Sequence, residues 1–332
     1  MTTIRLALIT VAAPLLFIVL GSLYLVIFTN LPQSLYMDSV RNIYFDCMQF
    51  VDRPYVYKMK PGPCRLSNIE YNITLTHDSR GFRNESAASE NDIAVLGDSH
   101  AHGFGVADDQ IFSYLLGTAQ TSKIINLAVG SYATQRELET MREYAQNAKY
   151  VILQYCDNDA SENDAALRLS EQEFRSQIET GWKSFIASYH EGKALGLKKP
   201  IADLANKIIN RAFISKSAWR DGFNERDMAR EASLFPQIID RYRDLLGGKR
   251  LIVFESAGWG FNSPKFEAAF TSELSRRDWL TYKVLDSSKL LDSGNYYFLD
   301  DHLNPSGHRK LAVALAREIA AWEKKSALIE TR

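Results

Sequence analysis

Two short segments, far apart in the chain, carry side chains that together could perform acyl transfer. Residues 97–100 read Gly-Asp-Ser-His and place Ser99 directly after a short apolar run. A serine at the end of a buried strand lies where open α/β sheets gather their working residues. Residues 300–305 place Asp300 two positions before His302. Because a serine hydroxyl needs an adjacent base that a third group orients, these residues predict a Ser-His-Asp arrangement.

Two further loops offer hydrogen-bond donors for such a site. An acyl-transfer site must stabilise the negative charge that develops on the carbonyl oxygen in the transition state. Gly130 follows the apolar run at 124–128, and its backbone amide could approach a ligand closely. Asn158 follows the run at 150–155, and its side-chain amide could donate an N–H. Both positions are expected at strand ends, as Ser99 is.

Each of these residues taken alone also has an ordinary structural interpretation. A Gly-Asp-Ser turn can simply cap a helix, and Gly130 and Asn158 are common types of loop residue. His100 and His102 are interpreted as solvated loop histidines that could line a pocket. His308 is interpreted as a residue that packs or caps at the start of the last helix.

The order Ser99, Gly130, Asn158 and His302 resembles the SGNH (GDSL-type) hydrolase superfamily, whose four signature positions are Ser, Gly, Asn and His. The resemblance extends from about residue 78 to the last helix, and residues 78–84 are similar to the lead-in of envelope-associated members. It implies a three-layer α/β/α fold with a central parallel sheet. It also implies no metal and no organic cofactor.

The resemblance assigns a role to each site residue. Ser99 would be the nucleophile, His302 the base and Asp300 its acidic partner. The oxyanion hole would consist of the Ser99 amide, the Gly130 amide and the Asn158 side chain.

The chain departs from the usual family pattern at three positions. Leu299 stands where the acid normally lies three residues before the histidine, so the D-x-H form points to Asp300, as in envelope polysaccharide O-acetylation enzymes. Asp301 is adjacent, and the choice between the two acids stays open. Cys156 occupies a position that is commonly glycine, and His100 one that is commonly leucine.

The pattern from residue 92 onward predicts the elements that must position these residues. Short apolar runs that predict strands lie at 93–96, 124–128, 150–155, 251–255 and 282–285. Helical patterns lie at 110–119, 135–148, 236–246, 264–276 and 306–325. Strands that alternate with helices of this length predict an α/β fold with a parallel sheet covered on both faces.

Two regions interrupt or precede this alternation. Residues 160–235 show no strand pattern and predict a helical insertion in the domain at 92–325, which could cover a site or merely pack against it. Residues 30–91 predict a stalk or N-terminal extension, with one strand at 71–76, that could fold back onto the domain.

The N-terminus predicts a membrane anchor. Residues 6–28 carry no charge and are long enough to cross a bilayer as a helix, so residues 1–29 are interpreted as a transmembrane signal anchor. The apolar core of a cleaved signal peptide, the alternative, is shorter, and no convincing cleavage site follows. The flanking charges weakly favour an extracytoplasmic main body, on the periplasmic side in a bacterium.

Composition and cysteine usage fit this location. The 332-residue chain has a net charge of −1, which gives no electrostatic footprint for nucleic acid. Cys47 and Cys64 could form a disulfide in an oxidising compartment, although two unpaired thiols are an open alternative. Cys156 is then left over.

These features predict a membrane-anchored serine esterase that acts on acyl or acetyl esters of an envelope glycan or lipid. An O-acetyltransferase that uses the same triad is an alternative, because water or a glycan could capture the acyl-enzyme. A non-catalytic glycan-binding protein that retains the fold is another. The sequence does not identify protein partners.

Overall fold

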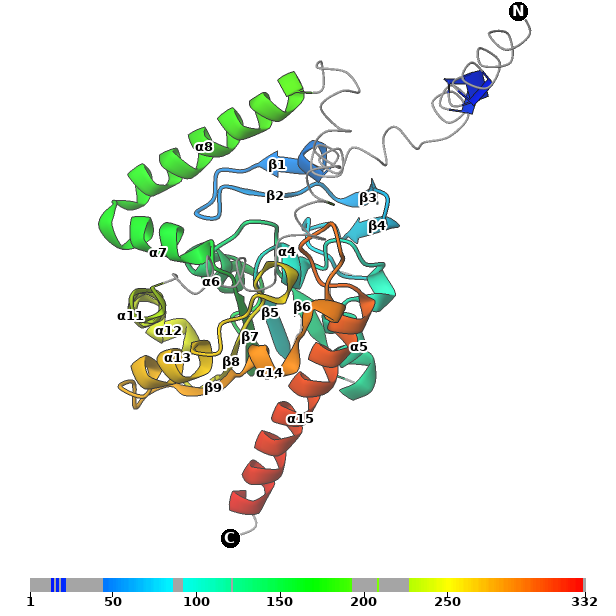
Figure 1. Cartoon of the computed structure of the whole chain (residues 1–332). Coiled ribbons are helices and arrows are strands. Elements are labelled where there is room, and N and C mark those ends of the chain that lie inside the picture. Colours follow the sequence, from blue (N-terminus) through cyan, green and yellow to red (C-terminus); the bar gives the residue numbers. More distant parts are fainter. Residues whose placement is uncertain are drawn as a thin grey trace, which may run out of the picture.

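A five-stranded parallel sheet forms the centre of the protein (Figure 1). The computed structural model describes residues 13–14, 16–17, 19–21, 44–85, 92–120, 122–192, 208 and 227–330. The strands are β5 (Ile93–Leu96), β6 (Ile124–Asn126), β7 (Tyr150–Tyr155), β8 (Arg250–Glu255) and β9 (Thr281–Leu285). Their spatial order is β6-β5-β7-β8-β9. The chain places β6 on one side of β5 and then adds β7, β8 and β9 on the other side, so the strand order reverses at β5. Such a switch point opens a crevice at the carboxyl ends of the strands.

Helices cover both faces of this sheet. One face is covered by α5 (Phe112–Gln120) and α15 (Pro305–Glu330), and the other by α6 (Thr134–Tyr144), α11 (Met228–Arg241) and α13 (Phe266–Leu274). In β5, Ala94 and Leu96 enter the core of the α6 face, whereas Ile93 and Val95 enter the core of the α5 face. The predicted α/β class, with a central parallel sheet between helices, is therefore confirmed.

The remaining elements are short or lie outside the sheet layers. They are α4 (Ser99–His102), η1 (Asp108–Gln110), α7 (Asp159–Arg168), α8 (Glu171–Gly192), α12 (Arg243–Leu246), η3 (Gly258–Gly260), α14 (Ser287–Leu290) and η4 (Ser293–Asn295). In the region predicted as a helical insertion, the described residues form helices apart from 169, 170 and 227, and residues 193–226 other than 208 lie outside the described part.

Two antiparallel hairpins precede the sheet and lie over its α4 end (Figure 1). The first pairs β1 (Met48–Phe50) with β2 (Tyr57–Met59), and the second pairs β3 (Gly62–Ser67) with β4 (Asn72–His77). Their apolar side chains belong to the same core as the sheet, as Tyr57, Leu66 and Leu75 show. This part of the extension is therefore packed on the α/β domain.

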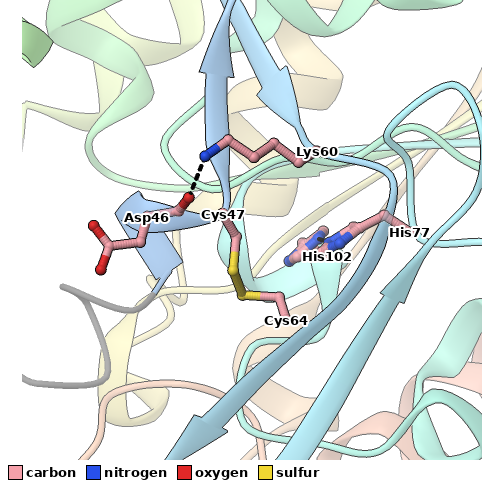
Figure 2. Close-up of a disulfide and its surroundings, with 6 residues drawn as sticks. All are labelled: Asp46, Cys47, Lys60, Cys64, His77 and His102. Atoms are coloured by element: carbon pink, nitrogen blue, oxygen red, sulfur yellow. Dashed lines mark hydrogen bonds between the residues drawn. A yellow bond between two sulfur atoms is a disulfide. The ribbon is translucent and has the colours of Figure 1, made fainter.

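A disulfide joins the two hairpins (Figure 2). Cys47 directly precedes β1, and Cys64 lies in β3, with their Cα atoms 6.1 Å apart. The sequence left this pairing open, and the structure contains it. Cys156 is a buried free thiol.

The predicted anchor at residues 6–28 lies largely outside the described residues. In the part of the chain that the structure does describe, no helix is long and apolar enough to cross a membrane.

Candidate active site

The turn that carries Ser99 is held by packing against the neighbouring strand. β5 ends at Leu96, and Gly97 adopts a φ of +147°, a conformation that favours glycine. A Cβ atom at Gly97 would lie 2.6 Å from the Gln154 Oε1 of β7, so this close approach requires glycine. The Gln154 Oε1 accepts the N–H groups of Asp98, at 3.0 Å, and Ala101, at 3.3 Å. Ser99 is therefore presented at the start of α4 by a fixed backbone.

Ser99, His302 and Asp300 lie in one hydrogen-bonded chain. The His302 Nε2 is 2.8 Å from the Ser99 Oγ, and the His302 Nδ1 is 2.5 Å from the Asp300 Oδ1. The Asp301 Oδ1 is farther from the same nitrogen, at 3.2 Å. The Asp301 side chain is also three times as exposed as that of Asp300, 32% against 10%. The structure thus places the three predicted triad residues together, with Asp300 in the nearer position.

Neighbouring charges shift the pKa values of both His302 and Asp300. Burial opposes protonation of His302, but the nearby carboxylates of Asp300 and Asp301 outweigh it and raise the pKa of the imidazole above its ordinary value. Burial likewise opposes ionisation of Asp300, but His302 and the hydroxyl of Tyr71 hold its pKa below the ordinary value. The arrangement therefore favours an ion pair between a carboxylate and an imidazolium.

The loop that carries Asp300 is braced by the β3–β4 hairpin. The Tyr71 hydroxyl donates to the Asp300 Oδ2 at 2.7 Å. The Glu70 carboxylate accepts three successive backbone N–H groups, those of Phe298, Leu299 and Asp300, at 2.8–3.0 Å. Sequence reasoning missed both braces, because each lies about 230 positions from its partner.

The Gly130 amide has a partner that the sequence did not indicate. Its N–H donates to the Tyr44 hydroxyl at 2.8 Å, and the Tyr57 hydroxyl donates to the Gly130 carbonyl at 2.9 Å. A Cβ atom at Gly130 would lie 2.7 Å from the Tyr44 hydroxyl, so glycine is what admits this phenol. The amide that was expected to donate to the oxyanion is thus already hydrogen-bonded to Tyr44, which lies four residues before β1.

Asn158 lies at the end of β7, the strand next to β5, and is exposed. It is the N-cap residue of α7, but its side chain makes no capping hydrogen bond. The structure gives no contact between Asn158 and the Ser-His-Asp chain. Cys156, two residues earlier, is buried, and burial together with the charge of Asp98 raises the pKa of its thiol.

The interpretation of His100 and His102 as solvated loop residues is wrong. Both lie in α4 and are buried, His102 against the β3–β4 hairpin and His100 against the loops after β8 and β9. The His100 Nδ1 is 3.1 Å from the Ser256 Oγ, and its ring centroid lies 4.9 Å from that of His302. The ring of His102 stacks on His77, with their Nε2 atoms 3.1 Å apart (Figure 2).

Burial lowers the pKa values of His77, His100 and His102, so these three imidazoles stay neutral at physiological pH. His308 behaves as the sequence predicted. It is buried near the start of α15, where its Nδ1 accepts the Phe112 N–H at 3.3 Å.

The segment at 78–84 fixes the loop that follows α4. The buried guanidinium of Arg83 donates to three backbone carbonyls, those of His102, Gly103 and Val106. Its Nε also donates to the Asp108 carboxylate at 2.7 Å. This segment therefore supports the nucleophile's helix from its carboxyl end.

The loop after β8 is hydrogen-bonded to the loop that carries Asp300 and His302. Trp259 has a φ of +54°, which is uncommon for a residue with a side chain, and its N–H donates to the Asp301 carbonyl at 3.1 Å. Strained backbone of this kind clusters at functional sites.

Within the described residues, Asp300, Asp301 and His302 are the one group whose side chains could together hold a metal ion. Two of the three, Asp300 and His302, belong to the hydrogen-bonded chain that ends at Ser99. No protein-family model matches the chain, and no curated protein matches its sequence. The structure by itself defines a three-layer α/β protein with a Ser-His-Asp chain at the carboxyl edge of its sheet.

Proposed function

We propose that this protein is a serine esterase of the SGNH type that hydrolyses acyl esters. The observation that carries the proposal is the continuous chain from the Ser99 Oγ through His302 to Asp300, at 2.8 and 2.5 Å. A nucleophile, a base and a group that orients the base are the parts that covalent acyl transfer needs. The half-exposed position of Ser99 gives a substrate access to it.

The mechanism assigns one task to each residue. The Ser99 Oγ attacks the ester carbonyl, and its proton passes to the Nε2 of a neutral His302. Asp300 holds the imidazole by its Nδ1 and stabilises the imidazolium that forms. The tetrahedral intermediate collapses, and its leaving alcohol takes the proton from His302. Water, activated by the same nitrogen, then hydrolyses the acyl-enzyme.

Backbone and side-chain N–H groups would stabilise the oxyanion. Ser99 is the first residue of α4, so its amide has no acceptor within the helix. Asn158 lies three residues after the adjacent strand β7, and its side-chain amide makes no capping hydrogen bond. Removal of one such donor lowers kcat about 10²–10³-fold in well-studied acyl-transfer enzymes.

We place this activity outside the cytoplasm, with residues 6–28 as a membrane anchor. The disulfide between Cys47 and Cys64 supports an oxidising compartment, because cytosolic thiols are kept reduced. The substrate would then be an acylated envelope glycan or lipid.

Labelling of the detergent-solubilised full chain with a fluorophosphonate tests the nucleophile directly. We expect one modified peptide, containing Ser99, and hydrolysis of a chromogenic acetyl ester. Ser99→Ala should abolish both, whereas Ser161→Ala, an exposed serine on α7, should change neither. Activity that survives Ser99→Ala would overturn the mechanism, and a folded protein that binds glycan without labelling would favour a binding role.

The same preparation distinguishes hydrolysis from transfer. With an added glycan acceptor, an esterase releases free acetate only. An acetylated glycan among the products would instead identify an O-acetyltransferase that uses the same triad.

A further inference from the structure

We propose that the hydroxyl of Tyr44 donates a hydrogen bond to the oxyanion in place of the Gly130 amide. The inference rests on the proposed esterase function and deepens it, since it adds a catalytic residue from outside the α/β domain. It is carried by the contact between Tyr44 and Gly130 and by what surrounds that contact.

The Gly130 amide is occupied by Tyr44. Its N–H donates to the phenol oxygen at 2.8 Å, which leaves no proton on this nitrogen for a substrate. The pair is next to the nucleophile's turn, because the N–H of Val129 donates to the Gly97 carbonyl at 3.2 Å. The hydroxyl of Tyr44 therefore lies beside the turn of Ser99, at the amide that the resemblance expects to donate to the oxyanion.

The phenol retains a donor of its own. Tyr44 is 4% exposed, and among the described residues its O–H donates to no acceptor. Burial raises the pKa of this hydroxyl well beyond the ordinary value, so the proton stays in place at physiological pH. An oxygen that accepts one hydrogen bond is also polarised toward giving a stronger one. Tyr44 thus offers the type of group that an oxyanion hole needs.

The ring is held in place on several sides. It makes edge-on contacts with the rings of His102 and Phe104, with centroids 5.7 and 5.4 Å away. The ring of Phe104 in turn lies 4.6 Å from that of His302, which brings this packing to the triad. The Tyr44 carbonyl accepts the N–H of Cys47, whose disulfide to Cys64 anchors the turn (Figure 2). These contacts hold the Tyr44 ring in one position, as a hydrogen-bond donor to the oxyanion requires.

The proposed step balances without proton transfer from Tyr44. When the Ser99 Oγ attacks, the carbonyl π-electron pair moves to the carbonyl oxygen, and the serine proton moves to His302. The Tyr44 O–H hydrogen-bonds to the new oxyanion and keeps its proton. On collapse, the electron pair re-forms the carbonyl and the alcohol leaves.

Fluorophosphonate labelling rates of the full chain test this role, because that reaction also forms an oxygen-centred charge at the site. We expect Tyr44→Phe to slow labelling about 10²–10³-fold and to lower kcat on an acetyl ester similarly. KM should change less than about threefold, since the contact forms in the transition state. Tyr132→Phe is the matched control, because it removes a buried hydroxyl that donates to the Tyr57 carbonyl. It should label at nearly the wild-type rate.

The other possible labelling results contradict either the proposed esterase function or the role of Tyr44. If wild-type protein does not label, the proposed function fails and the Tyr44 role fails with it. If wild type labels and folded Tyr44→Phe labels equally fast, the donor role alone is wrong. Faster labelling of Tyr44→Phe would mean that the phenol blocks the Gly130 amide, which also overturns it.

A second variant tests the same role if Tyr44→Phe does not fold, which a thermal unfolding measurement would show. Site-specific 3-fluorotyrosine at position 44 keeps the ring and its contacts but makes the hydroxyl a stronger acid. We expect a measurable rise in the labelling rate. An unchanged rate would contradict a hydrogen bond from this hydroxyl to the oxyanion.

Discussion

Two carboxylates lie within reach of the His302 imidazole, and their surroundings differ. Asp300 is 2.5 Å from the Nδ1 and receives a second hydrogen bond from the Tyr71 hydroxyl. Asp301 is 3.2 Å away and more exposed, so its charge is better screened by water. The geometry therefore assigns orientation of the base to Asp300 and a smaller electrostatic role to Asp301.

Replacement of each acid by its amide separates these roles. Asp300→Asn should lower kcat/KM on an acetyl ester about 10³–10⁴-fold, because an amide no longer fixes the productive imidazole tautomer. Asp301→Asn should lower it less than about fivefold. Steady-state kinetics on both variants, with thermal unfolding to confirm that they fold, makes the comparison. A greater loss in Asp301→Asn would reverse the assignment.

The pH profile reports the charge on His302. Only the neutral imidazole can accept the serine proton, and the two carboxylates raise its pKa above the ordinary value. The neutral fraction therefore grows with pH, and kcat/KM should still be rising at about pH 8. Asp301→Asn removes one of the carboxylates, so its midpoint should move to lower pH. A wild-type profile that levels off below about pH 7 would contradict the raised pKa.

The strands of the central sheet were more predictable than the hairpins that brace the site. β5 and β7 are buried on both faces and are apolar apart from Gln154 in β7, so both were predicted at their observed bounds. β1 and β2 have three residues each, too few to show an alternating pattern. Their existence depends on pairing with each other and on packing against the sheet.

The same distinction holds for the site. Ser99, His302 and Asp300 stand in short local motifs, so their being brought together could be predicted from the sequence. Tyr44 and Tyr71 could not, because a single tyrosine carries no local signal and its partner is set by the tertiary fold. The burial of His100 and His102 was missed for the same reason, since the tertiary fold brings His302 and His77 against them.

The β3–β4 turn offers a test of the brace on the triad's loop. Glu70→Ala leaves three backbone N–H groups without their acceptor, which should destabilise the fold by about 1–2 kcal/mol. It should also lower kcat about tenfold, because Asp300 loses its fixed position. Glu70→Gln keeps one acceptor oxygen and should recover part of both losses.

Truncation of the neighbouring exposed residue, Ile69→Ala, is the matched control for this turn. It should change neither kcat nor the unfolding midpoint by much. If Glu70→Ala has the unfolding midpoint and the kcat of the wild type, the β3–β4 hairpin does not position Asp300.

For the molecule as a whole, one buried pair of acids couples stability to pH. Glu137 of α6 and Asp159 of α7 are fully buried, and neither carboxylate has a hydrogen-bond partner among the described residues. Burial is the main reason that the pKa values of both are raised well above normal, and the charge of Asp98 adds to it. A carboxyl group in this setting keeps its proton in the folded state.

The sign of the pH dependence follows from this shift. The unfolded chain releases the Glu137 proton above its ordinary pKa of 4.5, whereas the folded protein retains it. The contribution of the protonated Glu137 to the free energy of unfolding is therefore fully present below pH 4.5. It decreases as the pH rises from there toward the pKa of Glu137 in the folded protein. Glu137→Gln cannot ionise, so its unfolding midpoint relative to wild type should increase between about pH 5 and 8. We expect an increase of about 2–6 °C, which corresponds to ~1–2 kcal/mol.

Differential scanning calorimetry across this pH range measures the effect, with Glu171→Gln on the exposed face of α8 as control. The control should follow wild type at every pH, because its carboxyl group is solvated in both states. A difference between Glu137→Gln and wild type that stays constant with pH would mean that Glu137 ionises alike in the folded and unfolded chains. In that case the buried pair would need a counter-charge, and the cation closest in sequence is Arg136, whose Nη1 has no hydrogen-bond partner among the described residues.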